Sequence, residues 1–229
     1  MRALIFDFDG TIVDTEPLHE AALRRALEPL DIPVRESMTI GLSDEDAIAK
    51  ACEEAGHGPL DAQAVASVFE AKVRAFTESM EVERTIVYPG AVDLFRTASL
   101  DMPVAICTAA MRAEVEPIIE WLGIQDSMSA LVTADEVERK KPAPDAYLLA
   151  CERVGVEPKH CLALEDSPRG AQSAVDAGLV TSALLHTTPE PDLALAHELS
   201  GRRRQVAEVF AQSWDPSRSP ARADACPRG

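Results

Sequence analysis

The chain has 229 residues, of which 46% are hydrophobic and 27% are charged, and these proportions are typical of a soluble globular protein with one or two domains. Its formal charge is −17, and a negative field of this size repels the phosphate backbone of nucleic acids and the surface of anionic membranes. We therefore expect neither nucleic acid nor a membrane as a partner, and an anionic small molecule could bind only where a metal ion or a lysine supplies positive charge.

Short apolar runs alternate with helical patterns along most of the chain, and uninterrupted apolar runs of this kind are typical of parallel strands buried on both faces. The sequence predicts strands at residues 3–6, 104–107, 130–132, 161–164 and 180–185, and helices at 115–122, 144–154 and 168–178. Gly123, Gly155 and Gly178 stand where these helices should end. The predicted fold class is α/β, with a Rossmann-like parallel sheet that carries helices on both faces.

The first strand ends in the acidic run Asp7-Phe8-Asp9-Gly10. Residues two positions apart on an extended chain point the same way, so Asp7 and Asp9 should face one site. In an open parallel sheet, ligands bind beyond the carboxyl ends of the strands, where two carboxylates can hold a cation, take a proton or attack an electrophile. The alternative is an acidic strand end that only caps a turn.

Residues 16–85 interrupt the alternation, because they contain amphipathic helical patterns and no convincing strand. The clearest pattern covers residues 62–80. Since strand-to-helix connections are usually short, we expect a small all-helical cap domain inserted after the first strand. The α/β core then comprises residues 1–15 and 86–200. Lys72 lies within the apolar stripe of this helix, and we expect its ammonium group to reach solvent from a buried stem.

Two later strands are followed by groups that could bind a phosphate. Thr108 and Ala109 follow the second core strand, where a hydroxyl and free backbone N–H groups can form an anion cradle, although Thr108 could be a simple helix N-cap. Lys141 precedes Pro142, and a residue before proline avoids helical geometry. Lys141 should therefore lie in a loop from which it can point inward, although a surface lysine is the alternative.

The fourth core strand ends in a second pair of acids, Glu165 and Asp166. If the strand belongs to the same sheet, these carboxylates converge with Asp7 and Asp9, although adjacent acids are more often simply solvated. Several carboxylates in one pocket repel each other unless a hard divalent cation lies among them. The sequence therefore predicts a Mg²⁺ site.

The remaining features concern the ends of the chain and its compartment. Residues 201–229 are expected to form a C-terminal helix and tail whose end is disordered. The five cysteines show no CxxC spacing, no signal peptide precedes the first apolar run, and no apolar stretch approaches the ~20 residues that span a bilayer. We expect a cytoplasmic protein. The sequence leaves the oligomeric state open, with a monomer slightly favoured.

The order of these motifs, DFDGT, then a threonine, then KPAP, then LED, resembles that of the haloacid dehalogenase superfamily of aspartate-nucleophile phosphotransferases. Within it, the runs DFDGTIVDTEPLHEAALRRAL, KKPAPDAY and LALEDSPRGAQSAVDAG resemble the branch of the β-phosphoglucomutases and phosphoglycolate phosphatases. The resemblance covers residues 1 to about 186.

The resemblance implies a role for each motif residue. Asp7 matches the nucleophile, and Asp9 matches the general acid and base, whose backbone carbonyl also meets the metal. Thr108, with Ala109 beside it, matches the site that binds the transferring phosphoryl group. Lys141 matches the family lysine, whereas Lys140 takes a place usually held by glycine. Asp166 matches the acidic metal ligand, with Glu165 as a direct or water-mediated partner. The implied metal ligands are Asp7, Asp9, Glu165 and Asp166.

The cap segment around Gly41, Ser43 and Asp44 resembles the specificity loop of the mutases. Mutases place an arginine where this chain has Asp44, to hold the second phosphate of a bisphosphorylated intermediate, and an acid there would repel that phosphate. Ser43 and Asp44 could instead only cap the next helix. His19 matches a histidine that faces the active site from the first cap helix, where it could contact substrate or pack between the domains.

The resemblance implies a Mg²⁺-dependent phosphatase that acts on a small phosphorylated metabolite, of the sugar phosphate or phosphoglycolate type, through an aspartyl-phosphate on Asp7. A hexose-phosphate mutase is the alternative among enzymes, and Asp44 argues against it. A receiver-type signalling domain also phosphorylates an aspartate on a parallel sheet. The helical insertion and the second acid, Asp9, argue against a receiver, which needs a long-lived phosphoaspartate.

Overall fold

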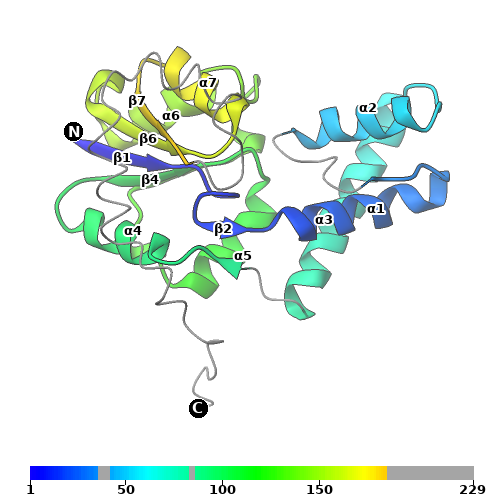
Figure 1. Cartoon of the computed structure of the whole chain (residues 1–229), viewed down its shortest axis with the longest axis horizontal. Coiled ribbons are helices and arrows are strands. Elements are labelled where there is room, and N and C mark those ends of the chain that lie inside the picture. Colours follow the sequence, from blue (N-terminus) through cyan, green and yellow to red (C-terminus); the bar gives the residue numbers. More distant parts are fainter. Residues whose placement is uncertain (36–41, 83–85, 185–229) are drawn as a thin grey trace.

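The protein is described by a computed structural model that covers residues 1–35, 42–82 and 86–184, without the side chains of residues 80–82 and 86 (Figure 1). A sheet with helices on both faces forms one part of this structure, and three helices form a second part beside it. Gly41, Leu185 and the expected C-terminal segment 201–229 lie outside the described residues.

The central sheet consists of five parallel strands in the order β5-β4-β1-β6-β7. The N-terminal strand is central, and its Ile5 pairs with Ala105 on one side and Ala163 on the other. All five predicted strands are confirmed, although β6 is one residue longer than expected and β7 ends two residues earlier. The strands are β1 (Ala3–Phe6), β4 (Val104–Cys107), β5 (Ala130–Val132), β6 (Cys161–Glu165) and β7 (Val180–Ala183).

Helices cover both faces of the sheet, as predicted for buried parallel strands. Helices α4 (Ala91–Ser99) and α5 (Arg112–Leu122) pack on one face, and α6 (Asp145–Val154) and α7 (Pro168–Asp176) on the other (Figure 1). Alternate residues of β1 point to opposite faces, so Phe6 packs against Phe95 of α4 and Ile5 belongs to the core on the side covered by α6 and α7. Burial of each such side chain contributes about 1.5 to 3 kcal/mol to stability.

The helix ends follow the local sequence signals. Gly123 and Gly155 end α5 and α6 with φ values of 62° and 67°, a left-handed conformation that glycine adopts without a steric penalty. Ser167 begins α7 as its N-cap, because its Oγ accepts a hydrogen bond from the backbone N–H of Gly170 at 3.1 Å. These caps fix where each loop leaves the carboxyl edge of the sheet.

The second part of the structure is a helical insertion, made of α1 (Glu16–Leu27), α2 (Asp44–Glu54) and α3 (Ala62–Val82). Its own apolar core contains Leu27 and Ile48. The insertion leaves the sheet through β2 (Val13–Asp14) and returns through β3 (Ile86–Val87), and these two strands pair in antiparallel fashion (Figure 1). Neither strand was predicted from the sequence, because a two-residue strand shows no periodicity.

Short 3₁₀ helices join several of these elements, and one of them carries a structural carboxylate. Glu136 accepts hydrogen bonds from Arg112 at 2.6 Å and from Arg153 at 2.7 Å, so it links α5 to α6. Among the described residues, no helix is both long enough and apolar enough to cross a membrane. The 3₁₀ helices are η1 (Glu28–Leu30), η2 (Gln125–Ser127), η3 (Ala134–Glu136) and η4 (Pro158–His160).

Candidate active site

Three buried carboxylates meet at the carboxyl edge of the sheet. Asp7 follows β1, Glu165 ends β6 and Asp166 follows it, and oxygen atoms of the three lie within 4.8 Å of one another. The backbone N–H of Asp7 donates to the carbonyl of Leu164 at 2.9 Å, which aligns the ends of the two strands. The structure therefore brings together three of the four predicted acidic residues.

Lys141 lies among these acids, in the loop before α6, and is only 6% exposed. Its ammonium donates to Asp7 Oδ1 at 2.8 Å, to Glu165 Oε1 at 2.6 Å and to the carbonyl of Cys107 at 2.9 Å. Burial acts to lower the pKa of Lys141, but Asp7 and Glu165 outweigh burial and raise this pKa well above its ordinary value. Lys141 therefore stays cationic. The neighbouring Lys140 does not enter this cluster but contacts Glu45 at 2.9 Å.

The pKa of Asp7 reflects an excess of negative charge in the cluster that one lysine does not offset. Burial and repulsion by Glu165 raise the pKa of Asp7 well above its ordinary value, despite the opposing effect of Lys141. A hard divalent cation between Asp7 and Asp166 would relieve this repulsion. The backbone of Gly10 lies close to the Asp166 carboxylate, and only glycine fits there, because a Cβ at this position would lie 1.9 Å from Asp166 Oδ2. The residues present therefore fit a Mg²⁺ ion.

Glu165 is held by other donors. Its Oε1 accepts from Tyr147 OH at 2.7 Å as well as from Lys141, and its Oε2 accepts from Ser167 Oγ at 3.2 Å. Both Tyr147 and Glu165 are fully buried. Tyr147 was not predicted as a site residue, because spacing alone does not tell which way a tyrosine hydroxyl points.

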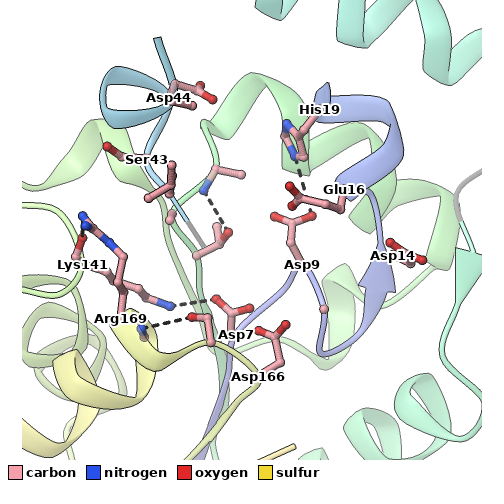
Figure 2. Close-up of a pocket in the computed structure, with 18 of the residues that line it drawn as sticks. Asp7, Asp9, Asp14, Glu16, His19, Ser43, Asp44, Lys141, Asp166 and Arg169 are labelled. Carbon is pink, nitrogen blue, oxygen red and sulfur yellow. Dashed lines mark hydrogen bonds and ion pairs between the residues drawn. The ribbon is translucent and has the colours of Figure 1, made fainter. Parts of the chain in front are cut away.

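Asp9 lies beside Asp7 but faces the helical insertion (Figure 2). Its Oδ1 accepts a hydrogen bond from the Thr15 hydroxyl and lies 3.8 Å from His19 Nε2. The His19 ring also stacks on Phe76 of α3, with ring centroids 4.4 Å apart. Thus His19 both faces the site and packs within the insertion, so the two interpretations left open by the sequence are compatible.

Thr108 and Ala109 form the turn after β4 at one side of the site. Thr108 is 2% exposed, and its Oγ1 accepts from the backbone N–H of Ala110 at 3.0 Å. Helix α5 begins only at Arg112, with Met111 as its N-cap. The alternative that Thr108 caps this helix is therefore wrong.

On the opposite side, Ser43 and Asp44 begin α2 (Figure 2). Ser43 is the N-cap, since its Oγ accepts from the backbone N–H of Asp46 at 3.2 Å. Asp44 does more than cap, because its Oδ1 lies 2.9 Å from the ammonium group of Lys72. Gly41, the third residue predicted here, is outside the described part of the chain.

The expectation that Lys72 reaches solvent is wrong. Its side chain is 2% exposed, and its ammonium donates to Glu114 Oε1 at 2.7 Å, to Asp44 and to His19 Nδ1 at 2.8 Å. Burial acts to lower the pKa of Lys72, but Asp44 and Glu114 outweigh it and raise the pKa. The physical reason is that α5 of the core and α2 of the insertion each bring a carboxylate to this point.

A pocket of about 530 Å³ separates the sheet edge from the insertion. This volume is in the usual range for small-molecule sites. Residues that follow the strands, among them Asp7 and Asp166, form the floor, and residues of the insertion, among them His19 and Asp44, form the opposite wall (Figure 2). Thr108, which follows β4, also lines the pocket. A small ligand would therefore contact both parts of the molecule.

A family model described as haloacid dehalogenase-like hydrolase matches residues 1–178. The chain belongs to this family. It is 36% identical over 178 residues to the fructose-1-phosphate phosphatase YqaB of Escherichia coli, an alignment that covers 77% of this chain and 92% of that protein. The named phosphatases among its relatives make this haloacid dehalogenase-like hydrolase an enzyme of the phosphoric monoester hydrolase type.

Solved structures support the fold of this haloacid dehalogenase-like hydrolase. CbbY from Rhodobacter sphaeroides, crystallised with phosphate, is 27% identical with a TM-score of 0.70, and the match covers 80% of this chain and 86% of that one. A β-phosphoglucomutase from Clostridium difficile has a TM-score of 0.78 over 93% of this chain and 97% of that one, at 19% identity. At that identity, the likeness concerns the fold alone. The predicted family and fold class are confirmed.

Proposed function

We propose that this protein is a Mg²⁺-dependent phosphatase that hydrolyses a small phosphomonoester, such as a sugar phosphate or phosphoglycolate, through an aspartyl-phosphate on Asp7. One observation carries the proposal. The carboxylate of Asp7 lies at the floor of a ligand-sized pocket, in contact with the buried ammonium of Lys141 and close to Asp166. An acid with a purely structural role needs neither a buried cation beside it nor contact with a pocket, so this combination supports a catalytic role for Asp7.

In the first step, a carboxylate oxygen of Asp7 attacks phosphorus and the bond from phosphorus to the ester oxygen breaks. The leaving alkoxide takes a proton from Asp9, whose carboxyl group faces the pocket. In the second step, water attacks the phosphorus of the aspartyl-phosphate, Asp9 accepts the proton of that water, and inorganic phosphate leaves with Asp7 regenerated.

Charge neutralisation makes the attack of one anion on another feasible. Lys141, with all its donors directed at the floor of the site, offsets the charge of Asp7 and of the phosphoryl oxygens. The Thr108 hydroxyl and the backbone N–H of Ala109, which line the pocket, would bind those oxygens, whereas the backbone N–H of Thr108 is used by the carbonyl of Val132. Asp7, the backbone carbonyl of Asp9 and Asp166 would hold the Mg²⁺ ion, with Glu165 beside them, and the ion supplies Lewis-acid stabilisation of the transferring group.

The helical insertion, residues 16–85, would act as a cap domain on the α/β core of residues 1–15 and 86–200. Among the described residues, two partly exposed ion pairs at the rim link the parts, between Lys140 and Glu45 at 2.9 Å and between Arg169 and Asp46 at 2.8 Å, in addition to the buried pair of Lys72 with Glu114. Exposed pairs of this kind contribute only about 0 to 1 kcal/mol each. They can therefore break and re-form as substrate enters and product leaves.

The substitution Asp7→Asn tests the nucleophile, because an amide cannot form the phosphoenzyme. We expect less than about one thousandth of the wild-type turnover of p-nitrophenyl phosphate with Mg²⁺, and none for the wild type in excess EDTA. The thermal unfolding midpoint should be unchanged or higher, since a repelling charge is removed from a buried cluster. A variant that kept more than about a tenth of the activity would rule out this role for Asp7.

The alternatives are disfavoured by the same geometry. A hexose-phosphate mutase needs a cation for the second phosphate, whereas Asp44 supplies an anion that is already paired with Lys72. A receiver-type domain must protect its phosphoaspartate from hydrolysis, whereas Asp9 lies beside Asp7 and would activate a water molecule that hydrolyses it. A coupled assay with a hexose 1-phosphate separates the mutase from the phosphatase, and repeated turnover of p-nitrophenyl phosphate excludes the receiver.

A further inference from the structure

The wall of the pocket opposite the nucleophile contains a buried lysine whose hydrogen-bonding capacity is used up. An ammonium group has three N–H donors and no acceptor. In Lys72 these three donors are directed at Asp44, Glu114 and His19 Nδ1, at distances of 2.7 to 3.0 Å. Since Lys72 can only donate, His19 must accept through Nδ1 and carry its proton on Nε2. No donor of Lys72 remains for a ligand.

The charge of Lys72 is also more than offset. Asp44 and Glu114 are two carboxylates in direct contact with one ammonium, and the side chains of Lys72 and Glu114 are 2% and 1% exposed. At such burial, water screens the charges of Lys72 and Glu114 poorly. A ligand that reaches this wall therefore meets a net negative group, although a lysine stands in its middle.

The rest of the wall is also rich in carboxylates. Among the described residues that line the pocket outside the proposed reaction centre, four are carboxylates and two, Lys72 and Arg169, are lysine or arginine, although one carboxylate, Glu20, is paired with Arg24 at 2.6 Å. Arg169 lies at the rim, where it donates to Asp46 at 2.8 Å and to the backbone carbonyl of Lys141 at 2.8 Å. The four carboxylates are Asp14, Glu16, Glu20 and Asp44.

From this wall we infer that the substrate carries a single phosphoryl group on a neutral, polyhydroxylated leaving group, and that Asp44 determines this specificity by neutralising Lys72. The inference rests on the proposed phosphatase activity and narrows its substrate class. Hydroxyl groups donate hydrogen bonds to carboxylates, whereas a second phosphate or a carboxylate on the substrate would be repelled and would lose its hydration without a new partner. Sugar phosphates fit this wall, and phosphoglycolate and sugar bisphosphates do not.

The test compares substrates that differ only in the charge at the far end. We would measure kcat/KM for 2-hydroxyethyl phosphate against 2-phosphoglycolate, and for fructose 1-phosphate against fructose 1,6-bisphosphate. The wild-type enzyme should prefer the neutral member of each pair by at least about tenfold. This comparison needs no variant, so it does not depend on whether a mutant folds. Equal or better hydrolysis of the charged member of either pair would overturn the inference.

The variant Asp44→Asn tests the residue. The amide keeps the size of Asp44 and a carbonyl acceptor for Lys72, but it removes one negative charge from the wall. The preference ratio should fall about tenfold in each pair, mainly through faster hydrolysis of the charged member. Glu45→Gln is the matched control, because it removes the same charge from the next residue of α2, whose side chain contacts Lys140 instead. It should change the ratio by less than about twofold.

The outcomes separate this inference from the proposed function. Equal changes in both variants would mean that the overall field, and not Asp44, sets the preference, and would overturn the role of Asp44. Loss of preference for neutral leaving groups with p-nitrophenyl phosphate still hydrolysed would reject the substrate class and leave the phosphatase intact. Failure to hydrolyse any phosphomonoester, p-nitrophenyl phosphate included, would reject the phosphatase and the inference with it.

Discussion

Two buried lysines, one at each side of the pocket, show how the same local chemistry can serve different ends. Lys141 contacts Asp7 and Glu165 at the sheet edge, and Lys72 contacts Asp44 and Glu114 in the opposite wall. Each is at most 6% exposed, and each uses three acceptors. The difference lies in the acceptors. Asp7, which accepts from Lys141, lies at the pocket floor and would react, whereas Asp44 and Glu114 only balance the charge of Lys72.

Burial and pairing alone therefore do not identify a catalytic lysine. Lys141 differs from Lys72 in its partner Asp7. Asp7 belongs to a cluster with Glu165 and Asp166, and this cluster still carries excess negative charge. The acids at Lys72 instead come from two separate parts of the molecule, so that ion pair joins the parts. We expect substitutions at Lys141 to affect chemistry first and substitutions at Lys72 to affect stability first.

The largest effect is expected for Lys141→Met. Loss of the ammonium leaves the charge of Asp7 and of the bound phosphoryl group uncompensated, so kcat should fall by about 10² to 10³. Steady-state kinetics with p-nitrophenyl phosphate would measure this loss. Lys140→Met is the matched control, because the neighbouring lysine contacts Glu45 and lies over the ring of Phe69, away from Asp7, and should alter kcat by less than about twofold. Similar losses in both variants would contradict the distinction between the two lysines.

Next in size is the effect of Lys72→Met on stability. The substitution strands Glu114, which is 1% exposed, without its cation, and breaking a buried ion pair in this way typically costs about 3 to 5 kcal/mol. Urea unfolding would measure the loss, with the exposed Lys50→Met as control. Adding Glu114→Gln should restore part of the stability, since no unpaired charge then remains. A Lys72 variant within about 1 kcal/mol of the wild type would refute this account of the pair.

A smaller effect is expected for Tyr147→Phe, which removes only the hydroxyl that donates to Glu165. Glu165 then lacks one of the donors that hold it beside Lys141, and kcat should fall about 3- to 10-fold with little change in KM. The control is a double-mutant cycle with Glu165→Gln. Strong coupling is expected if Tyr147 acts through Glu165, and additive effects would show that the ring contributes only packing.

The smallest effect concerns Glu136, a partly exposed carboxylate outside the pocket. Burial acts to raise the pKa of Glu136, but hydrogen bonds from Arg153, Thr133 and Arg112 outweigh it and lower the pKa to about 2. A lowered folded-state pKa stabilises the protein above the unfolded-state value of 4.5, and this contribution disappears as the pH falls from 4.5 toward 2. Because solvent screens the site, Glu136→Gln should cost only about 1 kcal/mol at pH 7.

Unfolding measurements at pH 7 and near pH 3 would test this last expectation. The free energy of unfolding of the Glu136→Gln variant should approach that of the wild type at the lower pH. A difference between the two proteins that did not shrink with acidification would mean that Glu136 stabilises the fold by packing and not by its charge. The same measurement on Lys72→Met would place both ion pairs on one scale.

The sequence predicted the sheet and the pocket floor well, for physical reasons. Buried parallel strands are uninterrupted apolar runs, and residues that follow them must meet at one edge, so Asp7, Lys141, Glu165 and Asp166 could be placed together. The opposite wall could not be predicted in the same way. Lys72 of α3 and Glu114 of α5 are 42 residues apart in the chain, and no periodicity encodes how those helices meet.

The errors have the same origin. Lys72 within an apolar stripe was the available signal, and it was interpreted as a buried stem whose ammonium group reaches solvent. The buried ion pairs depend on the positions of Asp44 and Glu114, which are set by how the insertion packs against α5. Likewise, the strands β2 and β3 are too short to show a pattern, and the hydroxyl of Tyr147 has no direction in a sequence.

The most direct test of the central claim is to trap the covalent intermediate. The wild-type enzyme would be mixed with Mg²⁺ and p-nitrophenyl phosphate, quenched in acid during the first turnovers, and digested for mass spectrometry at low pH. We expect one phosphoryl group on the peptide that contains Asp7, absent in Asp7→Asn and sensitive to hydroxylamine, as an acyl phosphate is. A phosphoryl group on another residue, or full turnover without one, would contradict nucleophilic attack by Asp7.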